Sequence, residues 1–142
     1  MKVLLAVDGS KSSLKGVDCV IEHADWYRRK PDVLLVTVQL PVPQLPNMGR
    51  IVSRAQIERF YEEEGSKALA AAKRKLAAAG IRCEARVLVG EVAESLVGAA
   101  KAARCDLICI GTRGMTELGG FALGSTATRV AHIADRPVLL AK

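Results

Sequence analysis

Apolar residues along the chain gather in five short runs that do not alternate with polar residues. Continuous runs of Val, Ile and Leu are typical of strands buried on both faces of a parallel sheet. The pattern therefore predicts strands at residues 2–7, 33–38, 85–89, 107–110 and 138–140.

Between these runs, apolar residues recur every three or four positions, which is the spacing of one buried helix face. The pattern predicts helices across residues 14–24, 57–79, 93–100 and 127–134. A cluster of Ser10, Ser12 and Ser13 stands where the first helix would begin and could cap it. Strict alternation of strand and helix predicts a single α/β domain over residues 1–142, an open, doubly wound, five-stranded parallel sheet with helices on both faces.

Composition narrows the class of protein. Half of the 142 residues are hydrophobic, which indicates a packed core and excludes a disordered chain. No run approaches the roughly 20 apolar residues needed to span a bilayer, so no membrane partner is expected. The apolar start of the chain ends at Asp8, too early for a signal peptide, and the expected location is the cytoplasm.

The net charge of +6 indicates a solvated basic surface or, alternatively, an electrostatic aid to a phosphate-bearing ligand. Basic residues are scattered and aromatic residues are few, so no nucleic-acid partner is expected. The cysteines are predicted to be free thiols: Cys19, Cys83, Cys105 and Cys109. Neither His23 nor His132 has an evident acidic or cysteine partner, and no metal-binding residue is predicted.

Three loops at the carboxyl ends of the predicted strands are candidates for chemistry, because ligands of open α/β sheets bind at that edge. Asp8 could accept hydrogen bonds from a ribose or an adenine amino group, or could only cap the next helix. Gly90 admits a close ligand or simply makes a turn. The proline-rich stretch 39–49 is either a plain connector or a ligand lid.

The strongest signal is the glycine-rich stretch from Gly111 to Thr126, which leaves a strand and enters a helix. Backbone N–H groups and a helix N-terminus form an anion site there, with Ser125 and Thr126 as hydroxyl donors. Arg113 could pair with phosphate or be a solvated loop residue. Gly119 to Gly124 has P-loop spacing, but Ser125 replaces the lysine that reaches the outer phosphates, which favours binding over fast phosphoryl transfer.

This stretch resembles the nucleotide motif of the universal stress protein family, Gly-x2-Gly-x9-Gly-Ser/Thr. Its fixed positions are occupied by Gly111, Gly114, Gly124 and Ser125. Two further segments, Val7-Asp8-Gly9-Ser10 and Pro137-Val138-Leu139-Leu140, also look like family signatures in the expected order, so the resemblance covers the whole chain.

The resemblance implies an adenine-nucleotide-binding Rossmann-like fold with strand order 3-2-1-4-5. It places Asp8 beside the adenine or ribose, the main chain of Val38 at the adenine edge, and Ile110 and Gly111 near the ribose. It implies ATP as the ligand, with Mg²⁺ on its phosphates. The phosphate-binding residues it implies are Gly114, Gly124, Ser125 and Thr126. It also implies a homodimer paired through the last strand, residues Val138, Leu139 and Leu140.

Three functions remain open on the sequence. The favoured one is a regulatory ATP-binding protein of the stress response that is not an enzyme. A slow ATPase, or a protein that phosphorylates itself on Ser125 or Thr126, is the second, although no positioned base is evident. The third is a dimerisation partner that has kept the fold without the ligand.

Overall fold

The computed structural model of the chain describes residues 1–26, 29–43, 53–112 and 123–142. Five parallel strands form one sheet in the order β3-β2-β1-β4-β5, which confirms the expected fold class and strand order. The strands are β1 (Lys2–Ala6), β2 (Asp32–Gln39), β3 (Cys83–Val89), β4 (Leu107–Gly111) and β5 (Val138–Ala141).

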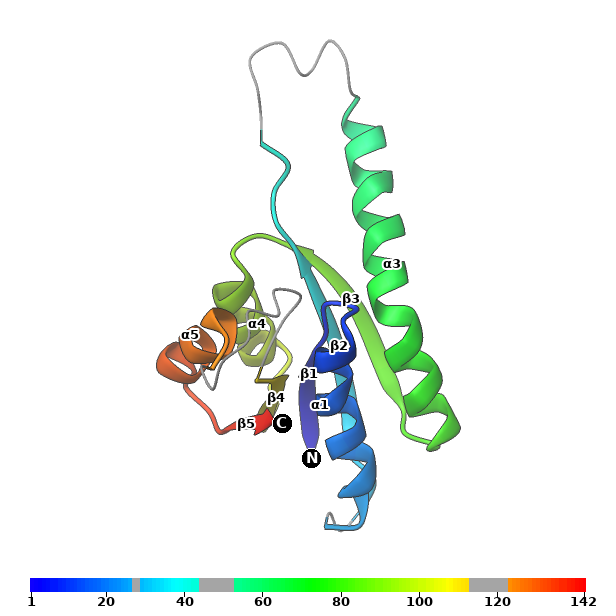
Figure 1. The fold of residues 1–142 in the computed structure, drawn as a ribbon, viewed down its shortest axis with the longest axis vertical. Helices are drawn as coiled ribbons and strands as arrows, with labels where there is room; N and C mark the ends of the chain where they lie inside the picture. Colours follow the sequence, from blue (N-terminus) through cyan, green and yellow to red (C-terminus); the bar gives the residue numbers. More distant parts are fainter. Residues whose placement is uncertain (27–28, 44–52, 113–122) are drawn as a thin grey trace.

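Helices cover both faces of this sheet, as Figure 1 shows. They are α1 (Lys11–Glu22), α3 (Arg54–Ala78), α4 (Val92–Ala102) and α5 (Ser125–Ile133). Val3 and Leu5 of β1 pack into a core with α1 and α3, whereas Leu4 and Ala6 pack into a second core with α4 and α5. Successive side chains of a strand point to opposite faces, so one uninterrupted apolar run supplies both cores.

Strand β1 lies at the centre of the sheet, between β2 and β4. Its connection to β2 runs through α1 on one face, while the chain enters and leaves β4 through α4 and α5 on the other face. The carboxyl ends of β1 and β4 therefore diverge at a topological switch point. Open α/β sheets bind their ligands in the crevice at such a point.

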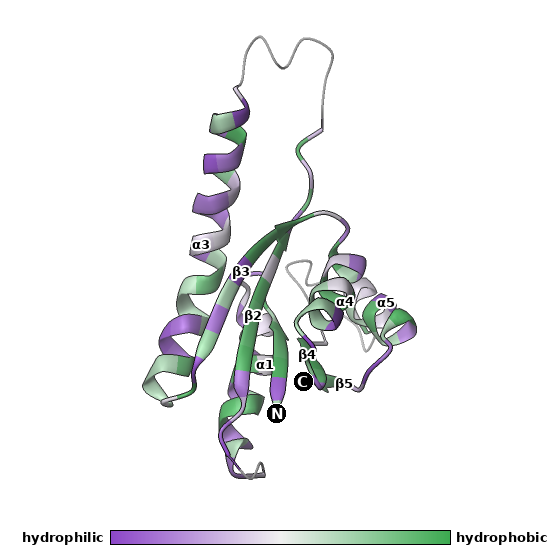
Figure 2. Cartoon of the chain, turned by 180° about the vertical axis from the view of Figure 1, so that it is seen from behind, coloured by the Kyte–Doolittle hydropathy of each residue, from purple (hydrophilic) through white to green (hydrophobic). Residues whose placement is uncertain are grey.

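The longest helix, α3, begins with a capping box in which Ser53 and Gln56 bond to each other's backbone N–H groups. Its first half extends beyond the sheet and is largely hydrophilic (Figures 1 and 2). The Tyr61 hydroxyl there accepts a hydrogen bond of 2.7 Å from the backbone N–H of Val42. The helix reaches the sheet at Gly65, where a Cβ atom would lie well inside van der Waals contact of both methyl carbons of Val87.

Several predicted element ends were wrong by one to three residues. Strand β1 ends at Ala6, although the Val7 N–H still donates a hydrogen bond of 2.9 Å to the Val36 carbonyl. Strand β3 begins at Cys83, where pairing with Val33 extends it across the charged residue Glu84, which the hydrophobic pattern does not mark. Helix α1 stops at Glu22, and Ala24 begins a separate 3-10 turn, η1 (Ala24–Trp26).

All four cysteines are free thiols, as expected. The Cys109 thiol is fully buried and donates a hydrogen bond of 3.6 Å to the Gly16 carbonyl, and its burial raises the pKa of Cys109 to about 12. The expectation that His23 has no cysteine partner was wrong. Its Nδ1 lies 3.7 Å from the Cys19 sulfur, because residues four apart on a helix are neighbours.

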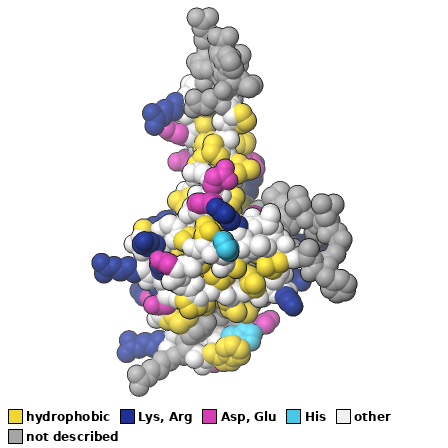
Figure 3. Space-filling view, turned by 90° about the vertical axis from the view of Figure 1, so that its left-hand side faces the viewer, with side chains coloured by type: hydrophobic (Ala, Val, Ile, Leu, Met, Phe, Trp, Pro, Cys, Tyr) yellow, Lys and Arg dark blue, Asp and Glu magenta, His cyan; other side chains and the backbone are white. Residues whose placement is uncertain are grey.

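The described parts of the chain contain no helix that is both long and apolar enough to cross a bilayer. Lys and Arg side chains are dispersed over the face that Figure 3 presents, with Asp and Glu side chains among them. The basic surface on that side is therefore mixed in charge.

Candidate functional site

The candidate site lies at the carboxyl ends of the central strands, where β1 pairs with both β2 and β4. Ala6 is in register with Val36 on one side and with Ile110 on the other. Beyond Ala6, the Val7 N–H donates a hydrogen bond of 2.9 Å to the Val36 carbonyl, so the contact with β2 continues to the residue before Asp8. The ends of β1, β2 and β4, which come from three distant parts of the sequence, therefore lie side by side at the switch point.

Asp8 is half-buried at the end of β1 and is not the cap of the following helix. The helix cap is Ser10, whose hydroxyl accepts a hydrogen bond of 3.1 Å from the Ser13 N–H. Asp8 instead accepts a hydrogen bond of 3.0 Å from the Ser10 N–H through its Oδ1 atom. The capping alternative for Asp8 is therefore excluded, and the carboxylate is held in place by the turn that follows it.

Ser13 is a residue of the site that sequence reasoning missed. Its side chain is buried, and its hydroxyl donates a hydrogen bond of 3.0 Å to the Ser10 carbonyl and accepts one of 3.3 Å from the Asp8 N–H. The sequence held the signal in the spacing Asp8-x-Ser10-x-x-Ser13, in which each polar residue lies within one helical turn of the next. The serine cluster suggested only a helix cap.

Gly111 ends β4 against the first turn of α1. A Cβ atom there would lie 2.9 Å from the Ser12 carbonyl oxygen and 3.3 Å from the Ser13 Cα, so glycine is required for this approach. The side chain of the preceding residue, Ile110, is buried in the core beneath α4 and α5. The backbone of Ile110 and Gly111 therefore forms the edge of the site.

Thr112 joins the two ends of the glycine-rich stretch, and the sequence analysis did not single it out. Its carbonyl accepts a hydrogen bond of 2.8 Å from the Gly124 N–H, and its own N–H donates one of 2.9 Å to the Ala141 carbonyl of β5. Two of the predicted phosphate-binding residues, Arg113 and Gly114, lie outside the described residues. The described flanks of the stretch are thus fixed to β4 and β5.

Gly124 is the N-cap of α5, and Ser125 and Thr126 are the first two residues of that helix. Glycine has no side chain that could cap the helix, so the partial positive charge of the N-terminal N–H groups remains available to an anion. The Ser125 side chain is exposed and that of Thr126 is half-buried. This helix end is bonded to Thr112 and therefore sits beside the end of β4.

Val38 lies near the end of β2, partly buried against the core beneath α4 and α5. It is paired with Leu88 of β3, and one residue further on the Gln39 carbonyl accepts a hydrogen bond of 3.0 Å from the Gly90 N–H. Gly90 thus makes the turn out of β3. Most of the proline-rich stretch 39–49 falls outside the described residues.

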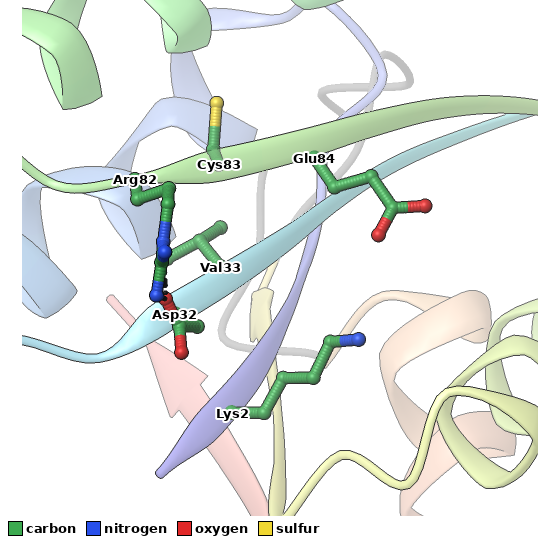
Figure 4. A pocket seen from close by; sticks show the side chains of 6 residues that line it. All are labelled: Lys2, Asp32, Val33, Arg82, Cys83 and Glu84. Carbon is green, nitrogen blue, oxygen red and sulfur yellow. Dashed lines mark hydrogen bonds and ion pairs between the residues drawn. The ribbon is translucent and has the colours of Figure 1, made fainter.

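A pocket of the described structure lies at the opposite edge of the sheet, at the amino ends of β1, β2 and β3 (Figure 4). Two of its charged side chains, Arg82 and Asp32, form an ion pair of 2.6 Å and are 84% and 51% exposed. Its lining residues are Lys2, Asp32, Val33, Arg82, Cys83 and Glu84. It is separate from the carboxyl-edge site.

Comparison with known proteins gives the family of the chain. The sequence model of the universal stress protein family matches residues 1–142. The chain belongs to that family. Universal stress protein YxiE of Bacillus subtilis is 30% identical over 99% of this chain and 98% of its own length. Universal stress protein MJ0531 of Methanocaldococcus jannaschii is 33% identical over 99% of this chain and 81% of its own length.

Solved universal stress protein structures share the fold. UspA from Lactobacillus plantarum superimposes with a TM-score of 0.81 over 100% of this chain and 97% of that one, at 18% identity. The protein from Archaeoglobus fulgidus in complex with dAMP gives a TM-score of 0.70 over 100% and 98% of the two chains, at 26% identity. A family member in complex with cAMP gives a TM-score of 0.68 over 100% and 96%, also at 26% identity.

Metal-binding side chains do not gather anywhere in the described residues: no three His, Cys, Asp or Glu lie close enough together to hold an ion. The residues around the candidate site are serine, threonine and glycine, with Asp8 as the carboxylate at the end of β1. Hydroxyl and backbone groups suit an anion, and any Mg²⁺ would have to take most of its ligands from that anion and from water.

Proposed function

We propose that this universal stress protein binds an adenine nucleotide, with ATP as its ligand, at the carboxyl edge of the sheet. The observation that carries the proposal is the hydrogen bond between Thr112 and Gly124, which brings the N-terminus of α5 to the end of β4 at the switch point, whereas Asp8 follows the neighbouring strand β1. An anion-binding helix end and a carboxylate at one site suit a molecule with phosphates at one end and hydrogen-bond donors at the other. The relatives crystallised with dAMP and cAMP support this ligand class.

In this proposal Asp8 accepts hydrogen bonds from the ribose or the adenine amino group, and the main chain of Val38 meets the adenine edge. Ile110 and Gly111 line the ribose through their backbone. Phosphates lie at the N-terminus of α5 and along the loop before it. The residues that hold them are Arg113, Gly114, Gly124, Ser125 and Thr126. Mg²⁺ arrives with the phosphates.

The proposed role is regulatory binding in a stress response in the cytoplasm, without catalysis. The position that a P-loop gives to lysine is occupied by Ser125, so the point charge that stabilises phosphoryl transfer is missing there. A second function has one observation in its favour: Ser125 is exposed at the helix end that would hold the phosphates. Slow phosphorylation of Ser125 or Thr126 would leave a phosphoprotein that mass spectrometry detects.

We also propose a homodimer paired through β5. This strand is at the edge of the sheet, and its neighbour is β4. The carbonyls of Pro137 and Ala141 point at β4, so by alternation the N–H and C=O groups of Val138 and Leu140 point outward. A row of outward backbone groups on an apolar edge strand is a template for pairing with a second copy.

Native mass spectrometry of the protein as purified is the first test, because it reports ligand mass and oligomeric state together. We expect a dimer that carries the mass of an adenine nucleotide, or that takes up ATP when ATP and Mg²⁺ are added. Isothermal titration with ATP, AMP and adenosine then shows how much the phosphates contribute to the affinity and how much the base and ribose contribute. A protein that remains empty at millimolar ATP and Mg²⁺ would contradict the proposal. It would favour the third function, a dimerisation partner that has kept the fold without the ligand.

A further inference from the structure

The turn that joins β1 to α1 contains a closed set of hydrogen bonds among three residues. The Ser10 N–H donates to Asp8 Oδ1 at 3.0 Å, and the Ser13 N–H donates to Ser10 Oγ at 3.1 Å. The Ser13 hydroxyl donates to the Ser10 carbonyl at 3.0 Å and accepts from the Asp8 N–H at 3.3 Å. Both the backbone and the carboxylate of Asp8 are therefore tied to α1.

Ser13 holds the central place in this set. It is 5% exposed, whereas Asp8 and Ser10 are half-buried. Without its hydroxyl the N–H of the half-buried Asp8 would lose its partner, and an N–H group left without a partner carries a free-energy penalty. The backbone at Asp8 would then relax toward water, and the carboxylate would move with it.

The same turn also supports the other side of the site. The Ser12 carbonyl and the Ser13 Cα are the groups closest to Gly111, at the end of β4. The first turn of α1 therefore contacts both Asp8 and Gly111, the residue that ends β4. A change in this turn should therefore alter the contacts with the base and ribose of the ligand. The N-terminus of α5, at the phosphate end, is held by a different contact, the hydrogen bond to Thr112.

We infer that Ser13 is a positioning residue for nucleotide binding: its buried hydroxyl orients Asp8 toward the base and ribose, while Ser13 itself does not touch the ligand. This inference rests on the proposed function. It requires that loss of the hydroxyl lower the affinities for adenosine and for ATP by the same factor, since the two ligands share the base and ribose and differ in the phosphates. Loss of a phosphate contact would weaken ATP alone.

The test is isothermal titration of the full chain and its Ser13→Ala and Ser13→Thr variants with adenosine and with ATP plus Mg²⁺. We expect Ser13→Ala to bind both ligands about tenfold more weakly, as the loss of one hydrogen bond that holds the half-buried Asp8 implies. We expect Ser13→Thr, which keeps the hydroxyl, to stay within about threefold of wild type. Ser53→Ala is the matched control, because it removes a capping hydroxyl from α3 that lies outside the site.

A ligand-free measurement separates positioning from general stability. We expect the Asp8 amide hydrogen to exchange about tenfold faster in Ser13→Ala than in wild type. Its exchange rate should be unchanged in Ser53→Ala. If Ser13→Ala does not fold, Ser13→Cys keeps the volume with a poor hydrogen-bonding group and should give the same equal loss for both ligands.

Three results would overturn the inference. They are Ser13→Ala affinities within twofold of wild type, a loss confined to ATP, and equal losses in the Ala and Thr variants. A wild-type chain that binds neither ligand would contradict the proposed function itself. In that case an Asp8 amide that exchanges equally fast in wild type and in Ser13→Ala would overturn the positioning role as well.

Discussion

The Gly124 N–H donates a hydrogen bond of 2.8 Å to the Thr112 carbonyl. This bond closes the glycine-rich stretch upon itself and places the first turn of α5 next to the end of β4. Gly124 has φ −60° and ψ 148°, values that most residues adopt. A strained backbone therefore does not explain glycine at this position.

This geometry predicts different effects for two substitutions of Gly124. Proline fits φ −60° but removes the N–H that closes the loop, so Gly124→Pro should weaken ATP binding by at least about tenfold. Adenosine, which has no phosphate, should bind within about twofold of wild type. Gly124→Ala keeps the N–H and isolates the effect of an added methyl group. Equal losses in both variants, by isothermal titration, would show that the closing bond is unimportant.

Asp8 is predicted to act on the other half of the ligand. Asp8→Ala should weaken ATP, AMP and adenosine by one common factor of about 10 to 100, because hydrogen bonds to a charged group are worth about 1.5–3 kcal/mol. Competition binding with the three ligands gives the ratios directly. A loss that grows with the number of phosphates would place Asp8 at the phosphate end and contradict the assignment.

Two glycines in helices should respond in opposite directions to alanine. Gly65→Ala should lower the free energy of unfolding by about 1–3 kcal/mol, because the new methyl group would collide with Val87 and push α3 off the sheet. Gly98→Ala in α4 is the matched control: outside the neighbouring backbone of α4, no atom of the described residues lies within 4 Å of the added carbon, and higher helix propensity should raise stability by about 0.5–1 kcal/mol. Urea unfolding curves measure both. A Gly65→Ala protein as stable as wild type would mean that α3 does not pack against Val87 at this position.

The buried thiol of Cys109 makes stability depend on alkaline pH. The unfolded chain loses this proton near pH ~8.5, whereas the folded protein keeps it until its pKa of about 12. Between these values the folded state binds more protons, so the free energy of unfolding falls as pH rises. Cys109→Ala should reduce that slope between pH 9 and pH 11 by up to about 1.4 kcal/mol per pH unit. Identical slopes in urea titrations would show that the thiol titrates normally.

Pairing through β5 predicts that the outward backbone groups of this strand control the oligomeric state. Leu140→Pro removes one outward N–H and leaves the groups that face β4 in place, so the dimer should dissociate at least about tenfold more readily. Sedimentation velocity over a range of concentrations measures this. A wild-type monomer would contradict the dimer, and an unchanged dimer in Leu140→Pro would place the interface elsewhere.

Much of this architecture could be read from local sequence. Unbroken apolar runs such as 107–110 indicated strands buried on both faces, and their alternation with helical patterns predicted a parallel, doubly wound sheet. The helix predicted across residues 127–134, with Ser125 and Thr126 at its N-terminus, corresponds to α5. Its start was marked by the step from glycine to two hydroxyl residues. These features depend on residues close together in the chain, so the spacing of apolar and polar residues reveals them.

Other features depend on contacts between distant residues and were decided by the tertiary structure. Strand β3 extends back to Cys83 because Val33 pairs with it, although Glu84 interrupts the hydrophobic pattern there. The sequence left Asp8 open as either a ligand or a helix cap. The fold excluded the helix cap because Ser10 caps α1, and ligand binding by Asp8 stays a prediction. The sequence by itself therefore determined which elements form, whereas the register between strands and the contacts of α1 with β4 decided which residues share the site.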